Sequence, residues 1–159
     1  MFDKYFISTT PIAVFNGLNR VEGGGDTTLE KYWGQVNTLL GQQSAQPSSV
    51  LLRSGVASSN NKIRANVTLQ NLSAVPLSNV VLYAVIYEKV VFSDSTVANG
   101  TEHNVVRGVT PAITIDSLDA GAVERYQLQH DSLSYDINYG VMIILKSPSG
   151  QIIQAYQAR

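Results

Sequence analysis

The sequence predicts a mainly β protein: a seven-stranded immunoglobulin-like β-sandwich preceded by a small unit of two strands and one helix. Three observations support this prediction. After residue 50 the hydrophobic residues recur with a period of two, and turn-forming residues interrupt them at short intervals. Residues 27–41 carry a hydrophobic stripe with the period of a helix. A small, polar stretch, GQQSAQPSS, lies between the two parts.

The N-terminal unit is predicted to be a hairpin followed by a helix. Residues 12–15 form the first strand, Asn16-Gly17 is a typical hairpin turn, and residues 20–23 form the return strand. These features place the unit at residues 1–43, the linker at 44–49 and the sandwich at 50–159.

The helix has a start signal, an end signal and one hydrophobic stripe. Thr27 and Glu30 form a capping-box pattern, with Asp26 as the alternative cap. Gly41 suits the left-handed position that often follows the last helical turn. Six hydrophobic residues fall on the same side of the helix: Leu29, Tyr32, Trp33, Val36, Leu39 and Leu40.

Seven strands are predicted after the linker, and turn signals separate them. They are residues 50–57, 62–72, 79–91, 104–115, 123–129, 137–146 and 151–157. The second alternates apolar and polar residues from Ile63 onward, so one of its faces should meet water. Residues 80–87 are apolar on both faces, so that strand should be central or covered. The SPSG turn at 147–150 should join the last two strands into a hairpin.

The composition excludes several classes of function. The 159-residue chain has 11 Lys and Arg against 12 Asp and Glu and no basic run, which argues against a nucleic-acid partner. No stretch approaches the roughly 18 apolar residues of a membrane span, and the N-terminus does not have the pattern of a signal peptide. The absence of cysteine excludes disulfides, thiolate catalysis and sulfur-bound zinc. The low lysine content and many Ser, Thr, Asn and Gln favour an extracytoplasmic setting.

Two groups of motifs resemble a known kind of protein. The N-terminal unit resembles the cis-proline half of thioredoxin-like proteins in the segment TTPIAVFNG, the following RVEGG and the helix. Three later segments resemble the β-sandwich that follows the thioredoxin-like domain in certain bacterial envelope and outer-membrane proteins. They are EHNVVRGV, SLDAGAVERYQL and YGVMIILKSPSGQIIQAYQA. The strand and CxxC-bearing helix that begin the thioredoxin fold have no counterpart in this sequence. The chain therefore resembles the C-terminal part of such a protein.

The resemblance implies a peptide contact and an association surface. In thioredoxin-like folds the matching proline follows a cis bond beside a substrate peptide, so Thr10 and Pro11 are candidate peptide contacts. The alternative is that Pro11 simply starts a strand. The strand at 12–15 lacks the partner that a complete thioredoxin fold provides, and an open edge invites pairing. We therefore expect a homo-oligomer, in its simplest form a homodimer, that associates through Ile12, Val14, Phe15, Tyr32 and Trp33. Packing on the chain's own sandwich, or a mobile unit, are the alternatives.

Other polar and aromatic residues have simpler structural explanations. His103 and His130 are not accompanied by a recognisable nucleophile. His130 is expected to be a hydrogen-bonded turn histidine, and His103 and Arg107, four apart on one strand face, are expected to make structural polar contacts. Turn geometry explains the loop acids better than calcium does. Core packing explains most tyrosines better than a stacking platform does. The acids are Asp116, Asp119, Asp131 and Asp136, and the tyrosines are Tyr83, Tyr87, Tyr126, Tyr135, Tyr139 and Tyr156. No metal site and no cofactor are predicted.

Three functions are compatible with these patterns. The first is a non-catalytic binding and assembly module of a cell-envelope or secreted protein, with a protein or peptide partner. The second is a fragment of a thioredoxin-like thiol–disulfide oxidoreductase whose catalytic half is absent. The third is a carbohydrate-binding sandwich, which a solvent-exposed row of aromatic residues on one sheet face would favour.

Overall fold

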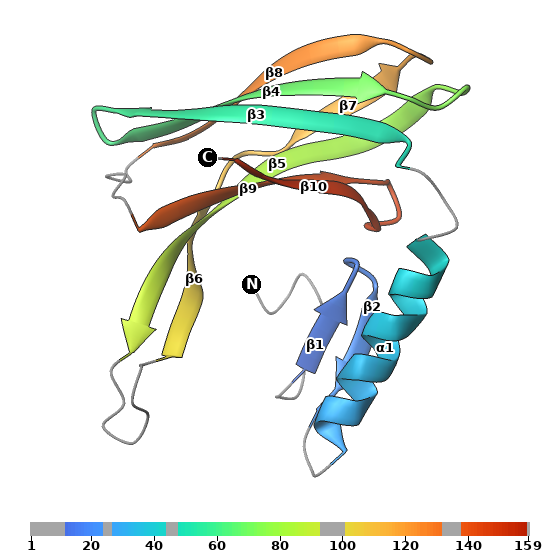
Figure 1. Cartoon of the computed structure of the whole chain (residues 1–159). Coiled ribbons are helices and arrows are strands. Elements are labelled where there is room, and N and C mark those ends of the chain that lie inside the picture. The colour runs from blue at the N-terminus through green and yellow to red at the C-terminus, as the bar shows by residue number, and fades with distance from the viewer. Residues whose placement is uncertain (1–11, 24–26, 44–47, 93–100, 132–137, 159) are drawn as a thin grey trace. The chain divides into compact units, whose positions relative to one another are not determined.

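Antiparallel β-strands make up most of the structure, a computed structural model that describes residues 12–23, 27–43, 48–92, 101–131 and 138–158. The predicted mainly β class is confirmed. The chain divides into two units, Met1–Pro47 and Ser48–Arg159 (Figure 1).

The first unit contains a hairpin and one helix. Strand β1 (Ile12–Phe15) pairs antiparallel with β2 (Asn19–Glu22), and helix α1 (Thr28–Gln43) follows. Asn16 and Gly17 have φ values of 50° and 75°, and Leu18 N donates to Phe15 O at 3.1 Å. Asn and Gly tolerate positive φ better than other residues, so the predicted Asn-Gly turn is confirmed.

Helix α1 begins as predicted but ends later. Lys31 N donates to the carbonyl of Thr27 at 3.1 Å, which makes Thr27 the residue that precedes the first helical turn. Gly41 lies within the helix, which continues to Gln43, so the prediction that Gly41 ends it is wrong. Glycine permits the left-handed conformation without requiring it, and the two glutamines that follow are good helix formers.

The second unit is built from two antiparallel sheets of immunoglobulin-like type (Figure 1). One sheet has the order β3-β4-β8, and its strands are Val50–Ser59, Lys62–Asn71 and Val123–Asp131. The other has the order β10-β9-β5-β6, with β7 also paired to β5. Its strands are β5 (Leu77–Phe92), β6 (Thr101–Val109), β7 (Ile113–Leu118), β9 (Tyr139–Lys146) and β10 (Ile152–Ala158).

The described part of this unit has eight strands rather than the predicted seven, because the segment 104–115 is interrupted. β6 and β7 pair in succession with the same edge of β5, and Thr110 bridges the gap between them. Thr110 N donates to Ala84 O at 2.9 Å, and Thr110 Oγ1 accepts from Ala84 N at 3.0 Å. Pro111 has no N–H to donate, so the β6 ladder ends there. The hydroxyl of Thr110 serves as the acceptor for Ala84 N.

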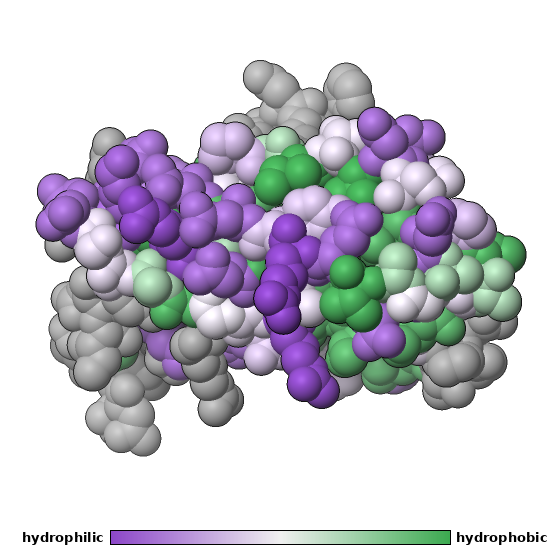
Figure 2. Space-filling view, turned by 90° about the horizontal axis from the view of Figure 1, so that it is seen from above, coloured by the Kyte–Doolittle hydropathy of each residue, from purple (hydrophilic) through white to green (hydrophobic). Residues whose placement is uncertain are grey.

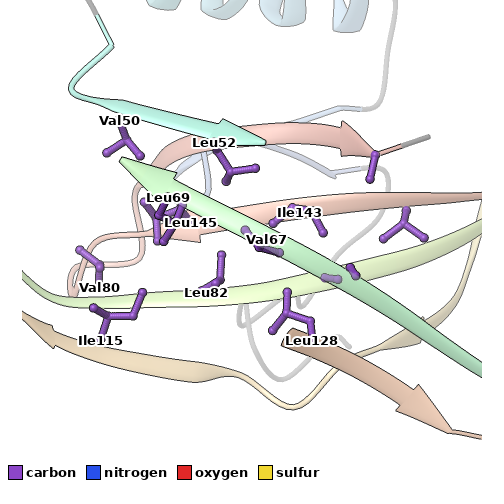
Figure 3. Packing of buried hydrophobic residues seen from close by; sticks show 14 of the residues in the cluster. Val50, Leu52, Val67, Leu69, Val80, Leu82, Ile115, Leu128, Ile143 and Leu145 are labelled. Atoms are coloured by element: carbon purple, nitrogen blue, oxygen red, sulfur yellow. The ribbon is translucent and has the colours of Figure 1, made fainter. Parts of the chain in front are cut away.

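The core lies between the two sheets, where their hydrophobic side chains point toward one another (Figure 3). The predicted alternation in β4 is confirmed: Ile63, Ala65, Val67 and Leu69 are all buried. The predicted central position of residues 80–87 is also confirmed, since β5 pairs with strands on both sides. Most other members of the core come from β5 and β9, namely Val80, Leu82, Ala84, Ile86, Val141, Ile143 and Leu145.

Asn71 is the most completely buried polar side chain among the described residues, with 0% exposure. Its Nδ2 donates to Val75 O and Leu118 O, both at 2.9 Å. Its Oδ1 accepts from Ser73 N at 2.9 Å and from Ser73 Oγ at 2.7 Å. These bonds satisfy the amide and fix the connection that leaves β4. An Asn at this depth is no glycosylation acceptor, although Asn71 begins an Asn-x-Ser sequence.

Candidate functional site

Helix α1 carries an exposed hydrophobic stripe. Leu29, Trp33 and Leu40 are 66%, 57% and 58% exposed, and Val36 between them is half-buried. Positions 29, 33, 36 and 40 are spaced by four, three and four residues, which is the spacing of a and d positions in a coiled-coil seam. We call these four residues the outer stripe. Large hydrophobic side chains gathered on one surface are typical of an interaction site.

The adjoining part of the helix surface packs on its own hairpin. The rings of Phe15 and Tyr32 lie 6.0 Å apart at 66°, an edge-to-face contact. The predicted single stripe of six residues is therefore divided between two surfaces. The hairpin has only two strands of four residues, which is too narrow to cover the whole stripe, so half of the six stripe residues stay exposed.

The residues expected to mediate self-association differ in their surroundings. Trp33 is exposed and available to a partner, whereas Phe15 and Tyr32 are engaged with each other. Val14 is half-buried in β1. Ile12 pairs with Glu22 through the backbone ladder. The candidate peptide contacts Thr10 and Pro11 lie outside the described residues.

The outward face of the β3-β4-β8 sheet is polar and basic. Strand pairing places Arg53, Thr68 and Arg125 directly opposite one another in one row across the three strands. The arginines are exposed, and neither side chain forms a hydrogen bond or ion pair with any other residue that the structure describes. Thr68 lies between them on the central strand. Sequence reasoning missed this row, because strand register rather than sequence proximity brings it together.

Two further cations lie on the same face, and both are bonded. Lys62 Nζ lies 3.4 Å from Asp131 Oδ1, and Arg64 Nε donates to Gln129 Oε1 at 2.9 Å. We call this outward surface, with Arg53, Lys62, Arg64 and Arg125, the basic face. Figure 2 shows hydrophilic side chains running across it.

Amide side chains and a depression adjoin the arginine row. Gln127 Nε2 donates to Asn66 Oδ1 at 3.2 Å in the neighbouring row, where Gly55 is the third member. A shallow depression of about 340 Å³ is lined by Asn66, Val67, Thr68, Arg125, Tyr126 and Gln127. Most of these side chains can donate or accept hydrogen bonds. The surface is therefore suited to a polar ligand.

Hydrophobic residues gather at one end of the same unit. The row of the basic face beyond the arginines consists of Leu51, Gln70 and Val123. The chain after the end of β4 adds Leu72 and Val75. Leu51, Leu72, Val75 and Val123 are 37%, 54%, 63% and 57% exposed. Figure 2 shows more hydrophobic surface toward one end of its view than toward the other.

The outward face of the β5-β9 pair has no exposed aromatic row. Tyr83 and Tyr87 are only 6% and 7% exposed. Lys146 Nζ lies 5.4 Å from the centre of the Tyr83 ring, and Gln157 Nε2 donates to Tyr87 Oη at 2.6 Å. Tyr126 and Tyr139 are half-buried, and Tyr156 is 36% exposed. Among the described tyrosines, the stacking platform that would favour carbohydrate binding is therefore not found.

Of the two histidines, His130 alone has a described side chain. It lies in strand β8 opposite Ile63, and its buried Nδ1 has no hydrogen-bond partner among the described residues. The expectation of a turn histidine is therefore wrong. Arg107 donates from Nε to Glu88 Oε2 at 2.7 Å, a structural polar contact of the expected kind. The side chain of His103 is outside the described residues.

The loop acids do not converge in the part of the chain that the structure describes. No group of three or more His, Asp or Glu side chains there is arranged to hold a metal ion. Asp131 bonds Lys62, and Asp119 accepts from Ser117 Oγ at 3.4 Å. Asp136 lies outside the described residues. No helix within the described ranges has the length and apolar character needed to cross a membrane.

Comparison with known proteins gives structural likenesses alone. No protein-family model matches the sequence, and no curated protein matches it. HBP35 of Porphyromonas gingivalis superposes with a TM-score of 0.69 at 11% identity, covering 98% of this chain and 54% of that one. The chain thus spans about half the length of HBP35. A domain of the outer membrane lipoprotein Omp28 from the same organism gives a TM-score of 0.48 at 12% identity, covering 72% of this chain and 89% of that one. At these identities the likeness to HBP35 is one of fold.

Proposed function

We propose that this chain is a non-catalytic binding and assembly module of a cell-envelope or secreted protein, which pairs with a second copy through helix α1. One observation carries the proposal: Leu29, Trp33 and Leu40 are more than half exposed on a helix whose adjoining surface, at Tyr32, already packs on the hairpin of β1 and β2. Leaving a tryptophan and two leucines in water is unfavourable, and a partner that covers them gains hydrophobic free energy.

The outer stripe favours a second helix as the covering surface. Its four-three-four spacing is a heptad pattern, which brings one helix against another with side chains interlocking. The same stripe on a second copy would be self-complementary about a two-fold axis. The seam spans only about three turns of α1, so we expect a weak and reversible dimer.

The envelope setting is supported by the sequence. The motifs that resemble thioredoxin-like envelope proteins occur in both units, and the composition is poor in lysine and free of cysteine. The fold shared with HBP35 is compatible with this setting.

A fragment of a thioredoxin-like thiol–disulfide oxidoreductase is the alternative. This chain has no cysteine, so a thiolate would have to come from sequence outside it. A CxxC motif in the reading frame upstream of Met1 would favour this alternative over the assembly module.

Solution mass measured over a range of concentrations tests the proposal. We expect the intact chain to shift from monomer to dimer as concentration rises, and Trp33→Lys to remain monomeric. Val123→Lys is a matched control, because Val123 is also 57% exposed but lies in the second unit. A wild-type chain that stays monomeric, or a Trp33→Lys variant that still dimerises, would contradict the proposal.

A further inference from the structure

We propose that the basic face binds the carboxylate groups of an acidic glycan, with Arg53 and Arg125 as the anion contacts and Asn66 and Gln127 as contacts to hydroxyl groups. This inference concerns a different surface from the outer stripe and does not depend on dimerisation.

The first argument is the distribution of charge. The whole chain has nearly equal numbers of cations and acids, yet four of its 11 Lys and Arg lie on this one face with a single acid, Asp131. Asp131 is already bonded to Lys62 and accepts from Gln129 Nε2 at 2.9 Å. The basic face therefore has an excess of positive charge that its own residues do not balance.

The second argument is the geometry of the arginine row. Residues directly opposite on neighbouring strands have Cβ atoms about 5 Å apart. Arg53 and Arg125 flank Thr68, so their Cβ atoms are separated by roughly twice that distance. Two long guanidinium side chains can converge on one carboxylate across that span, and the Thr68 hydroxyl can donate between them. A bound anion would also relieve the repulsion between the two unpaired cations.

The third argument concerns the neighbouring row and favours a glycan over a simple anion. The bond from Gln127 to Asn66 uses one donor and one acceptor, so Asn66 Nδ2 and Gln127 Oε1 keep free hydrogen-bonding capacity. A methyl group added at Gly55 would meet no atom within 4 Å, so the surface beside the amides is open. Sugar hydroxyls both donate and accept, which matches this pair of amides.

A nucleic acid fits this surface less well. Binding of single strands relies on aromatic side chains that stack on the bases. The rows of the basic face contain no aromatic residue, and Tyr126, which lines the adjoining depression, is half-buried on the other face of β8. Acidic sugars do not require such stacking when charge and hydroxyl contacts supply the recognition.

Calorimetric titration of the full chain with oligogalacturonate at low salt tests the inference. We expect Arg53→Gln and Arg125→Gln each to weaken binding about fivefold to tenfold, the loss expected for a charge-assisted hydrogen bond at an exposed site. Arg64→Gln removes the same charge from the same face, but its guanidinium is already bonded to Gln129, so binding should change less than twofold. Lys31→Gln, on helix α1, should have no effect.

Poly-L-glutamate of matched length separates glycan recognition from charge attraction. We expect it to bind more weakly than oligogalacturonate, and we expect Asn66→Ala and Gln127→Ala to weaken the glycan alone. Equal binding of both polymers, an Arg64→Gln loss as large as that of Arg53→Gln, or no binding by the wild type would each overturn the inference. Thermal unfolding of every variant checks that the fold is retained. The dimer test of the proposed function measures solution mass with different variants, so either proposal can fail without the other.

Discussion

The ring of Tyr87 on β5 lies directly over Gly140 on the neighbouring strand β9. A Cβ atom added at Gly140 would overlap the Tyr87 ring and its hydroxyl. Glu88 and Tyr87 pair with Tyr139 and Gly140 in this register, so both backbones are fixed by the ladder. The absence of a side chain at Gly140 is what allows a tyrosine on the outward face of the sheet to be 7% exposed.

We expect Gly140→Ala to destabilise the second unit by about 1–3 kcal/mol, because the ring or the strand must move to admit the methyl group. Urea unfolding would measure the loss. Gly55→Ala is the matched control, since Gly55 also lies in a strand but its added methyl group meets nothing within 4 Å. That variant should be neutral or slightly more stable.

The contact itself can be tested in a second background. In Tyr87→Leu the obstructing ring is gone, so adding Gly140→Ala should cost much less than it does alone. Equal losses in both backgrounds would show that the ring is not the cause.

Asn71→Ala should be among the most damaging single substitutions in the chain. Removing the amide leaves the buried Leu118 carbonyl without the donor that now reaches it at 2.9 Å and Ser73 N without its acceptor, whereas the Val75 carbonyl still accepts from Ser73 Oγ at 2.6 Å. An unsatisfied buried polar group costs about 1–3 kcal/mol, so we expect a loss of roughly 2–4 kcal/mol in the free energy of unfolding. Asn71→Asp should be no better, because it removes the donor and buries a charge. A loss below 1 kcal/mol, on the order of an exposed substitution, would contradict this account.

Local patterns predicted the parts of the fold that local chemistry determines. The turn at Asn16 and Gly17, the alternation from Ile63 to Leu69 and the final hairpin all depend on residues within a few positions of one another. Gly150, in the SPSG turn, has a φ of 92°, which is the conformation that glycine supplies there.

Long-range contacts account for what the sequence did not reveal. Nothing local shows that Thr110 bonds Ala84 on another strand and so divides the segment 104–115 into two strands. The burial of Tyr87 depends on Gly140, which is far away in sequence. The arginine row of the basic face is likewise a product of strand register. The helical period did identify all four residues of the outer stripe, but it could not show that Tyr32, on the same predicted stripe, packs on Phe15.

Thr110→Val tests how β5 keeps its hydrogen bonds between β6 and β7. Valine has a similar shape but no acceptor, so Ala84 N would lose the bond it now makes to Thr110 Oγ1 at 3.0 Å. Ala84 is 1% exposed, so water cannot readily replace that bond. We expect a loss of about 1–3 kcal/mol by urea unfolding. Thr110→Ser keeps the hydroxyl and should lose less, and if the two variants were equal, the hydroxyl would have no role.

Ionisation of Tyr126 should contribute to the pH dependence of the free energy of unfolding. Burial raises the pKa of Tyr126 above its ordinary value, and a hydrogen bond to Glu124 and the charge of that carboxylate raise the pKa further. The folded state therefore holds this proton at pH values where the unfolded chain has released it. This contribution is complete below the ordinary tyrosine pKa of about 10 and is lost as the pH rises above it.

We expect the free energy of unfolding of the wild type to fall more steeply between about pH 9 and 11 than that of Tyr126→Phe, in which this ionisation is absent. The two proteins share every other titratable group, so the difference between the two curves isolates Tyr126. Glu124→Gln keeps the ring but removes the nearby charge, so its slope should lie between those of the other two proteins. Parallel curves for wild type and Tyr126→Phe would show that the proton on Tyr126 is held no more tightly in the folded state than in the unfolded one.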